Sequence, residues 1–260
     1  MELIREYEKR YMQISPGPIF SATLLDCVEQ GKDAYAGGAR YNNSSICAFA
    51  TANAVDSLLA IKHAVFEEKC ISLFQLRSVL LKNWVGHEML REKFIRSYPK
   101  YGNNNPEADE ITMDLIGFVA DYINNKPNAR GGVFRCGLFS IDWRSFFGEA
   151  MAATADGRFC GEALSKNMSA VVGRDKEGVT SLINSVTKID YTKVPNGTVL
   201  DVTLHHSAVA GADGLRALKS LLRVYLKKGG IAAQVNVLNP AILLEAQKNP
   251  EKYATLQVRL

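Results

Sequence analysis

The chain has 260 residues, of which 47% are hydrophobic and 22% charged, as in globular proteins with a large buried core. The formal net charge of +4 is small and evenly spread, which argues against nucleic acid or a membrane surface as a partner. No apolar run approaches the roughly 18 residues that span a bilayer, and the charged N-terminus lacks a signal-peptide segment. We therefore expect a cytoplasmic protein.

The first half of the chain is predicted to be mostly helical. Apolar residues at helical spacing predict an opening helix that ends at Pro16 and Pro18. A second helix over 19–30 is predicted to stop at Gly31, and 37–45 is predicted to be a turn-rich connection. Further helices are expected around 54–61, from Ser72 with Gln75 as a capping box, near 87–97 and over 107–124.

After Arg130-Gly-Gly132 the pattern changes to that of an α/β protein. Strands are expected over 133–141, 198–204 and 231–238 and from Leu256, with a long connection over 154–178 and either helix or strand over 179–190. An amphipathic helix that includes Leu215 and Tyr225 is predicted to end at Gly229-Gly230, and Asn239-Pro240 is predicted to open another. Strands that alternate with helices predict parallel pairing with right-handed crossovers.

One strand carries two amides on the same face. Gln234 and Asn236 interrupt the apolar pattern of 231–238, although a parallel strand inside a sheet is normally apolar on both faces. Such amides are typical of a strand that faces the lumen of a barrel, and equally of an edge strand in contact with solvent. The pattern alone leaves both interpretations open.

Short motifs do not define a catalytic centre by themselves. The five cysteines lack metal-ligand spacing, so we expect free thiols and no metal site. Ser185-Val-Thr-Lys188 matches a penicillin-binding motif without its companion motifs, which indicates chance. His205 and His206 are adjacent, so one is expected to pack inward and the other to face solvent.

Ordered motifs across nearly the whole chain resemble the glycyl radical enzymes of the pyruvate formate-lyase type. They are Gly37-Gly-Ala-Arg-Tyr-Asn42, Asp56-Ser-Leu-Leu-Ala-Ile-Lys62, Val65-Phe-Glu-Glu-Lys69, Gly86-His-Glu-x-Leu-Arg91, Pro99-Lys-Tyr-Gly-Asn103, Arg130-Gly-Gly132, Ala155-Asp-Gly-Arg158, Gly161-Glu, Ser185-Val-Thr-Lys188, Asn196-Gly197, Gly229-Gly-x-x-x-Gln234-x-Asn236-Val and Ala246-Gln-x-x-Pro250-Glu-x-Tyr253-x-x-Leu-x-Val-Arg259. The resemblance implies the second half of a ten-stranded β/α barrel, with a helix-rich first half. It also implies a division into 1–150, the C-terminal part of the pyruvate formate-lyase domain, and 151–260, a glycine radical domain.

The resemblance implies radical chemistry inside the barrel. A separate S-adenosylmethionine and iron–sulfur activase would install a radical on a glycine, and a cysteine thiyl radical would act on a small molecule. No bound cofactor is expected. We expect the catalytic cysteine to precede Met1 and the radical glycine to follow Leu260, so no catalytic residue is assigned in this chain, which alone would be inactive.

The substrate and site residues are expectations from the same resemblance. The first hypothesis is that the intact enzyme converts pyruvate and coenzyme A to acetyl-CoA and formate in anaerobic metabolism. A dehydratase or lyase for another small molecule, or a non-catalytic scaffold fragment, is the alternative. Phe139, near the position of a tyrosine in many dehydratases, is expected to bind substrate; Gln234, Asn236 and Arg259 are expected to face the lumen or support the radical loop. The expected partners are the activase, the complementary half-barrel and, in the intact enzyme, a second copy.

Overall fold

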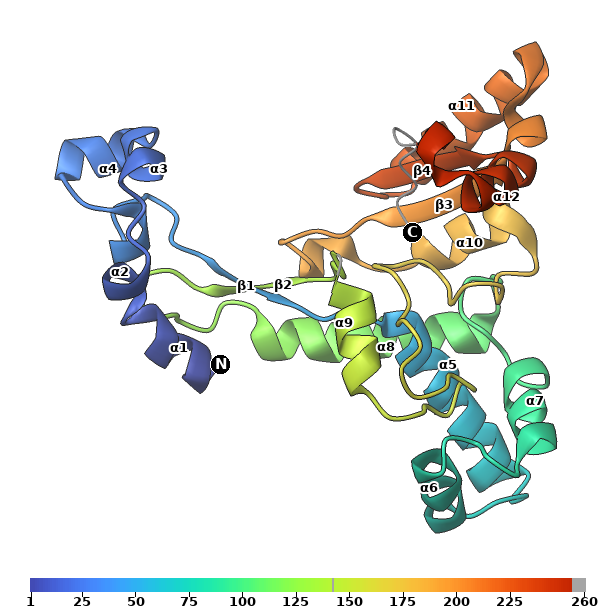
Figure 1. Cartoon of the computed structure of the whole chain (residues 1–260). Coiled ribbons are helices and arrows are strands. Elements are labelled where there is room, and N and C mark those ends of the chain that lie inside the picture. Colours follow the sequence, from blue (N-terminus) through green and yellow to red (C-terminus); the bar gives the residue numbers. More distant parts are fainter. Residues whose placement is uncertain (142, 254–260) are drawn as a thin grey trace.

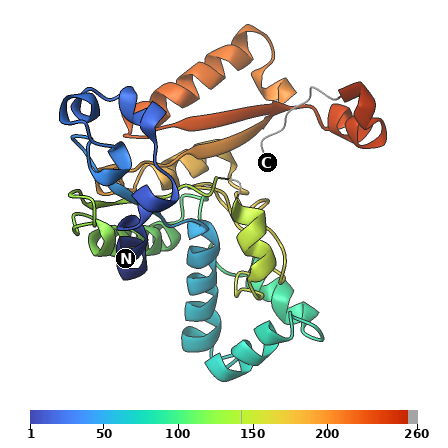
Figure 2. The same cartoon turned by 60° about the vertical axis from the view of Figure 1, so that its left-hand side comes forward.

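A computed structural model describes residues 1–141 and 143–253. An amino-terminal arm of short helices stands away from a larger helical and α/β body, and strands β1 and β2 run between the two (Figure 1). A view turned by 60° shows helix α11 lying along one side of strands β3 and β4 (Figure 2). No helix in the described part of the chain is long and apolar enough to cross a membrane.

The arm is more broken than the sequence predicts. Its helices are α1 (Glu2–Glu8), α2 (Tyr11–Ile14), α3 (Pro18–Ala22) and α4 (Leu25–Gln30). The predicted helix over 19–30 divides at Thr23, where the hydroxyl donates to the Phe20 carbonyl 2.7 Å away and competes with the helical bonding pattern. Gly31 ends α4 in the left-handed conformation with φ +57°, so the predicted stop is confirmed.

A strand that was not predicted begins at the end of the expected turn-rich connection over 37–45. Strand β1 (Ser44–Cys47) pairs in parallel with β2 (Phe134–Gly137), which lies about ninety residues further along the chain. Its register aligns Ser44 with Phe134 and Cys47 with Gly137. Because this pairing joins segments far apart in the sequence, the turn residues around 37–45 give no signal for the strand.

The predicted central helices are confirmed. They are α5 (Thr51–Ile61), continued by a π-helical turn over Lys62–Glu67, α6 (Leu73–Leu81), α7 (Glu88–Arg96) and α8 (Pro106–Ile123). Ser72 and Gln75 form the predicted capping box, in which the Ser72 hydroxyl accepts the Gln75 N–H at 3.2 Å. A separate apolar cluster that includes Trp84 and Phe94 fastens α5, α6 and α7 together.

The second half has the predicted alternation of helices and strands. Its elements are α9 (Trp143–Ala150), α10 (Gly178–Val186), β3 (Leu200–His205), α11 (Gly211–Lys227), β4 (Ala233–Leu238) and α12 (Pro240–Lys248). The structure makes the ambiguous 179–190 stretch a helix. Asn239 caps α12 as predicted, its Oδ1 accepting the Ala241 N–H at 3.0 Å. The expected strand from Leu256 lies outside the described residues.

The strands are parallel and follow one another in space. Within the described residues, β1 pairs with β2 and β3 pairs with β4. The end of β2 adjoins the start of β3, because the Leu138 N–H donates to the Gly197 carbonyl and the Asn196 N–H to the Cys136 carbonyl, both at 3.0 Å. This succession of parallel strands with helical crossovers is the α/β arrangement predicted for part of a barrel.

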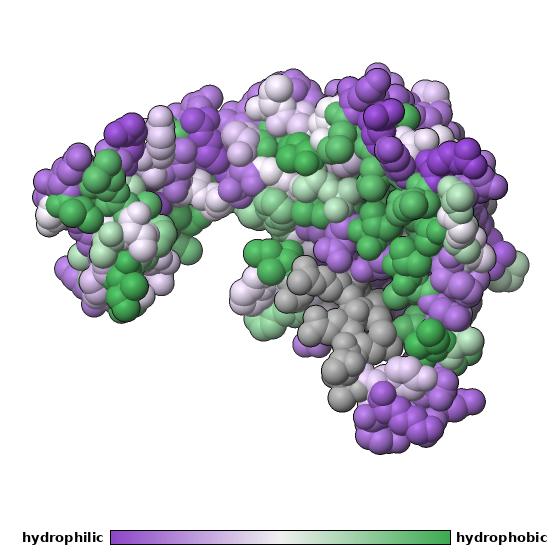
Figure 3. All heavy atoms as spheres, turned by 90° about the horizontal axis from the view of Figure 1, so that it is seen from above, coloured by the Kyte–Doolittle hydropathy of each residue, from purple (hydrophilic) through white to green (hydrophobic). Residues whose placement is uncertain are grey.

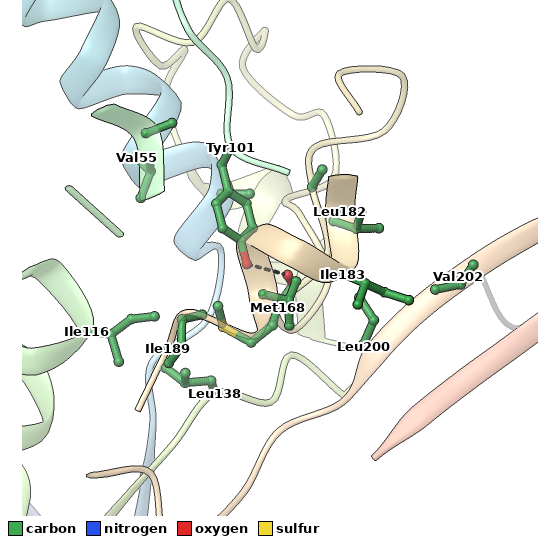
Figure 4. Close-up of a cluster of buried hydrophobic side chains, with 14 of the residues drawn as sticks. Val55, Tyr101, Ile116, Leu138, Met168, Leu182, Ile183, Ile189, Leu200 and Val202 are labelled. Atoms are coloured by element: carbon green, nitrogen blue, oxygen red, sulfur yellow. Dashed lines mark hydrogen bonds between the residues drawn. The ribbon is translucent and has the colours of Figure 1, made fainter. Parts of the chain in front are cut away.

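The largest buried cluster lies between the helices and one face of β3 (Figure 4). Leu200 and Val202 of β3 contribute to it together with side chains from α5, α8 and α10. Tyr101 is fully buried there, and its hydroxyl donates to the Met168 carbonyl at 3.0 Å. That bond ties the long connection over 154–178 to the core.

Candidate functional site

The face of β3 and β4 opposite the core is polar. The parallel register places Asp201 beside Gln234 and Thr203 beside Asn236, so these four residues share one face, which we call the polar face. Leu200 and Val202 of β3 point the other way, into the core. Gln234 and Asn236 therefore share the face turned away from the core, on a strand that within the described residues pairs only with β3.

A chain of hydrogen bonds fixes the polar face to the end of β2. The Asp201 carboxylate accepts from the Asn167 amide at 2.6 Å, and the Asn167 carbonyl oxygen accepts from the Ser140 backbone N–H at 2.8 Å. The Ser169 hydroxyl accepts the Asp201 N–H at 2.9 Å and donates to the Asp201 carbonyl at 3.0 Å. Because Asn167 adopts a positive φ of 37°, a tight turn holds its amide against Asp201.

Phe139 is half-buried two residues after the end of β2, next to Ser140 of this hydrogen-bonded chain. Its ring lies against the backbone of Gly197: a Cβ at that glycine would be 3.4 Å from the Phe139 Cζ. Gly197 has a φ of +84°, a conformation in which a side chain would be strained. The ring is thus held against the turn that leads into β3, apart from the main buried cluster.

The two predicted amides lie close together. The Gln234 Nε2 is 3.4 Å from the Asn236 Oδ1, and both side chains are half-buried. Amides of this kind donate and accept hydrogen bonds without changing charge, so they can hold a polar ligand or a backbone segment at any physiological pH. Arg259, the fourth predicted residue, lies outside the described residues.

Asp201 and Asn167 also belong to this site, although neither is among the residues predicted from the sequence. A signal for Asp201 was present, since it alternates with Leu200 and Val202 in the same manner as the two amides alternate with valines. For Asn167 no local signal existed, because a long connection without periodicity brings it to β3.

A second, buried network surrounds the motif Ala155-Asp-Gly-Arg158. The Asp156 carboxylate accepts from Asn53 at 2.6 Å and from Thr154 at 2.5 Å, while the buried Arg158 guanidinium donates to backbone carbonyls, including that of Glu162 at 2.7 Å. Nearby, burial raises the pKa of Asp56 to about 7 despite the hydrogen bond from the Tyr101 N–H. These contacts hold loops and helices together.

The isolated motifs have structural roles. The Ser185 hydroxyl accepts the Asn104 N–H at 2.8 Å, and the Lys188 ammonium pairs with Asp109 at 2.6 Å. His205 and His206 are both exposed, with ring centroids 4.3 Å apart, so the expectation that one packs inward is wrong. The reason is that β3 ends at His205 and a 3-10 turn begins at the next residue.

The cysteines are free thiols, with Cys27 and Cys136 buried and Cys47, Cys70 and Cys160 exposed. Burial raises the pKa of Cys136 to about 11, which keeps this thiol protonated at neutral pH. Residues 1–141 and 143–253 contain no group of three His, Cys, Asp or Glu side chains placed to hold a metal ion.

Two family models match the chain. A pyruvate formate lyase-like model matches residues 1–148, and a glycine radical model matches residues 164–260. Together they cover nearly the whole sequence, including every strand of the structure.

Curated relatives and solved structures give the same family. Trans-4-hydroxy-L-proline dehydratase of Clostridioides difficile is 36% identical over 94% of this chain and 31% of its own length. (2S)-3-sulfopropanediol dehydratase of Klebsiella oxytoca is 34% identical over 97% of this chain and 31% of its own. The B12-independent glycerol dehydratase structure from Clostridium butyricum superposes with a TM-score of 0.90 at 36% identity, covering 97% of this chain and 32% of that one.

These comparisons help to choose between the two hypotheses for the substrate, pyruvate or another small molecule. The chain spans about a third of the length of the relatives it matches. Those relatives are named as dehydratases, and another as a 4-hydroxyphenylacetate decarboxylase, so their names favour the dehydratase or lyase alternative over pyruvate formate-lyase. The partial barrel, the two matched models and these relatives agree: the chain belongs to the glycyl radical enzymes of the pyruvate formate lyase-like family.

Proposed function

We propose that this chain forms one wall of the reaction chamber of a glycyl radical dehydratase or lyase that acts on a small hydroxylated molecule. The observation that carries the proposal is the polar face of β3 and β4, which presents a carboxylate, a hydroxyl and two amides away from the core. The relatives named above act on hydroxyproline, sulfopropanediol and glycerol, which are all small and carry hydroxyl groups.

The residues of the polar face have distinct parts in this proposal. Asn167 donates to the Asp201 carboxylate and Ser169 bonds to the Asp201 backbone, so these contacts orient the carboxylate toward the polar face. Gln234 and Asn236 donate to and accept from the substrate or the loop that carries the radical. Phe139 covers the turn at Gly197 and keeps water from that side of the chamber, which protects radicals from quenching. We also propose that Arg259 supports the loop that carries the radical.

The proposal requires partners outside this chain. A radical on glycine, when installed by the activase, supplies the oxidising equivalent that produces a cysteine thiyl radical. The rest of the barrel, with the cysteine loop, would close the chamber opposite the polar face. We further propose that the boundary between the two domains lies near residue 150, that the intact enzyme is a homodimer and that it acts in the cytoplasm.

Pyruvate formate-lyase chemistry stays a second candidate because of one residue. Phe139 stands near the position where the resemblance expects a tyrosine in dehydratases, and a phenyl ring has no hydroxyl to bond a substrate oxygen. The nearby Ser140 and Asn167 supply polar groups that a dehydratase could use instead.

The test is an anaerobic assay of the gene product at its natural length with a radical activase. Electron paramagnetic resonance should show a glycyl doublet, and product analysis should show loss of water from one of a panel containing glycerol, 1,2-propanediol and trans-4-hydroxy-L-proline. Formate and acetyl-CoA from pyruvate with coenzyme A would instead establish the second candidate. A doublet with turnover of neither group would overturn both.

A further inference from the structure

A cavity of about 290 Å³ lies between helices α5, α7 and α9 and the connection over 154–178. Four arginines line it: Arg91, Arg144, Arg158 and Arg174. Its volume is close to the lower end of the range for small-molecule sites, about 300–1,000 Å³. We call this cavity the arginine pocket. It shares no residue with the polar face.

Among the described residues, the four guanidiniums contact carbonyls, the Thr154 hydroxyl and a ring, not carboxylates. Arg91 donates through Nε to the Gly157 carbonyl at 2.6 Å and stacks over the Phe159 ring at 3.7 Å. Arg144 donates only to the Leu164 carbonyl, at 3.3 Å, within the described residues. Their remaining N–H groups are therefore available to a ligand.

The other two arginines, of which Arg158 is buried, are also held by backbone oxygens. Arg158 donates to the Glu162 carbonyl at 2.7 Å, and Arg174 donates to the Ile95 carbonyl at 2.9 Å. In residues 1–141 and 143–253, no carboxylate lies within ion-pair distance of any of the four guanidiniums. A carbonyl oxygen satisfies an N–H group but leaves the positive charge uncompensated.

The acidic residues of the pocket do not restore neutrality. Asp156 is 1% exposed, and its carboxylate is occupied by neutral donors on Asn53 and Thr154. Glu162 is exposed and accepts the Phe159 N–H at 2.9 Å. Four cations against two carboxylates leave an excess of two positive charges around one cavity.

A buried hydroxyl in the pocket wall also lacks a partner. Ser165 is 3% exposed, and its Oγ makes no hydrogen bond within the part of the chain that the structure describes, although the backbone N–H of the same residue donates to Asn53 at 2.6 Å. An unpaired buried hydroxyl costs free energy that a bound acceptor would recover. It lies in the wall that carries Leu164, the residue whose carbonyl Arg144 contacts.

We propose that the arginine pocket binds a small oxyanion: a phosphate, sulfonate or carboxylate group. Planar guanidiniums match the oxygens of such groups with paired N–H donors. The ligand would compensate the excess positive charge and accept a hydrogen bond from the Ser165 hydroxyl. Arg144 and Arg91 are the ligand-binding arginines, since they keep unused donors, while Arg158 and Arg174 hold the surrounding loops.

The test is titration of the gene product at its natural length with phosphate, methanesulfonate or acetate, followed by calorimetry at constant ionic strength with chloride as the reference salt. Saturable binding of at least one anion is expected. Arg144→Gln should weaken it about tenfold, the loss of roughly one charge-assisted hydrogen bond. Arg144→Lys, which keeps the charge but not the fork, should give an intermediate loss, and Ser165→Ala a smaller one.

Arg77→Gln is the matched control, because it removes the same charge from exposed α6, outside the pocket, and should leave binding unchanged. Circular dichroism checks folding; if Arg144→Gln does not fold, Arg144→Lys and Ser165→Ala decide. Absence of saturable binding by all three anions would overturn the proposal, as would an equal loss in Arg77→Gln. The order of affinities among the three anions would identify the bound group.

Discussion

Asp56 shows how one buried carboxyl can link folding to pH. The residue is 1% exposed on α5, and loss of solvation raises its pKa to about 7, although the Tyr101 N–H at 2.9 Å and the charges of Lys100 and Arg174 lower it. In the unfolded chain the same carboxyl titrates near its ordinary value of about 3.9. Between these two values the folded state holds a proton that the unfolded state has released.

The expected consequence is a loss of stability as pH rises. The contribution of Asp56 is fully present below about pH 4 and declines until about pH 7, because the folded pKa is the higher one. Asp56→Asn should remove this decline, an effect of a few kcal/mol in the free energy of unfolding. Urea unfolding at pH 4.5 and 7.5 measures it, and Asp213→Asn, on an exposed carboxylate, is the control. An unchanged pH dependence in Asp56→Asn would contradict the assignment.

At the level of single residues, sequence reasoning found the groups whose signal is local. Two helix starts are predicted from motifs of at most four residues, Ser72 with Gln75 and Asn239 with Pro240, and the structure has both caps. Gln234 was conspicuous because an amide interrupts an apolar alternation. By contrast, Asn167 and Arg144 reach their sites through long-range packing, which no spacing in the sequence records.

Strand β3 has one face toward the core and the other on the polar face, and this alternation of its side chains can be tested. Val202 is buried against the core, and its neighbour Thr203 is exposed on the polar face. Val202→Ala should lower the free energy of unfolding by about 2 kcal/mol, since it leaves a cavity. Thr203→Ala should change it by less than about 0.5 kcal/mol. Urea denaturation of both variants checks the face assignment, and equal losses would refute it.

Among the elements, helices with amphipathic patterns and the two later strands were predictable, and β1 was not. A four-residue strand such as Ser44–Cys47 carries too few residues for a periodic signal, and its partner β2 is distant in sequence. The stretch around α10 was ambiguous because its apolar residues fit both periods. Its burial against Leu200 and Tyr101 selects the helix.

The whole molecule exposes much apolar surface. Figure 3 shows hydrophobic residues gathered in several groups on the body as well as on the arm. Exposed aromatic side chains include Trp143 and Phe146 of α9 and Phe118 of α8. Within the described residues, β4 pairs on one side only. Surfaces and edges of this kind are normally covered by other segments or chains.

The 260-residue chain, produced alone, should therefore self-associate. The exposed aromatic groups, and the edge of β4 that pairs with no strand among the described residues, favour contacts between copies. Light scattering after size-exclusion chromatography should show a mass that rises with concentration. A monomer at all concentrations, with a sharp cooperative thermal transition, would argue against the half-barrel interpretation.

The central claim is that the polar face lines the chamber in which the reaction occurs, and a pair of neighbouring substitutions on β4 tests it most directly. Asn236→Leu alters the polar face, and Val237→Leu alters the opposite face of the same strand. The measurement is kcat/KM of the activated enzyme at its natural length, with radical content matched by electron paramagnetic resonance. We predict a loss of about tenfold or more in Asn236→Leu, the equivalent of one lost polar contact, and little change in Val237→Leu. Equal values for the two variants would contradict the account.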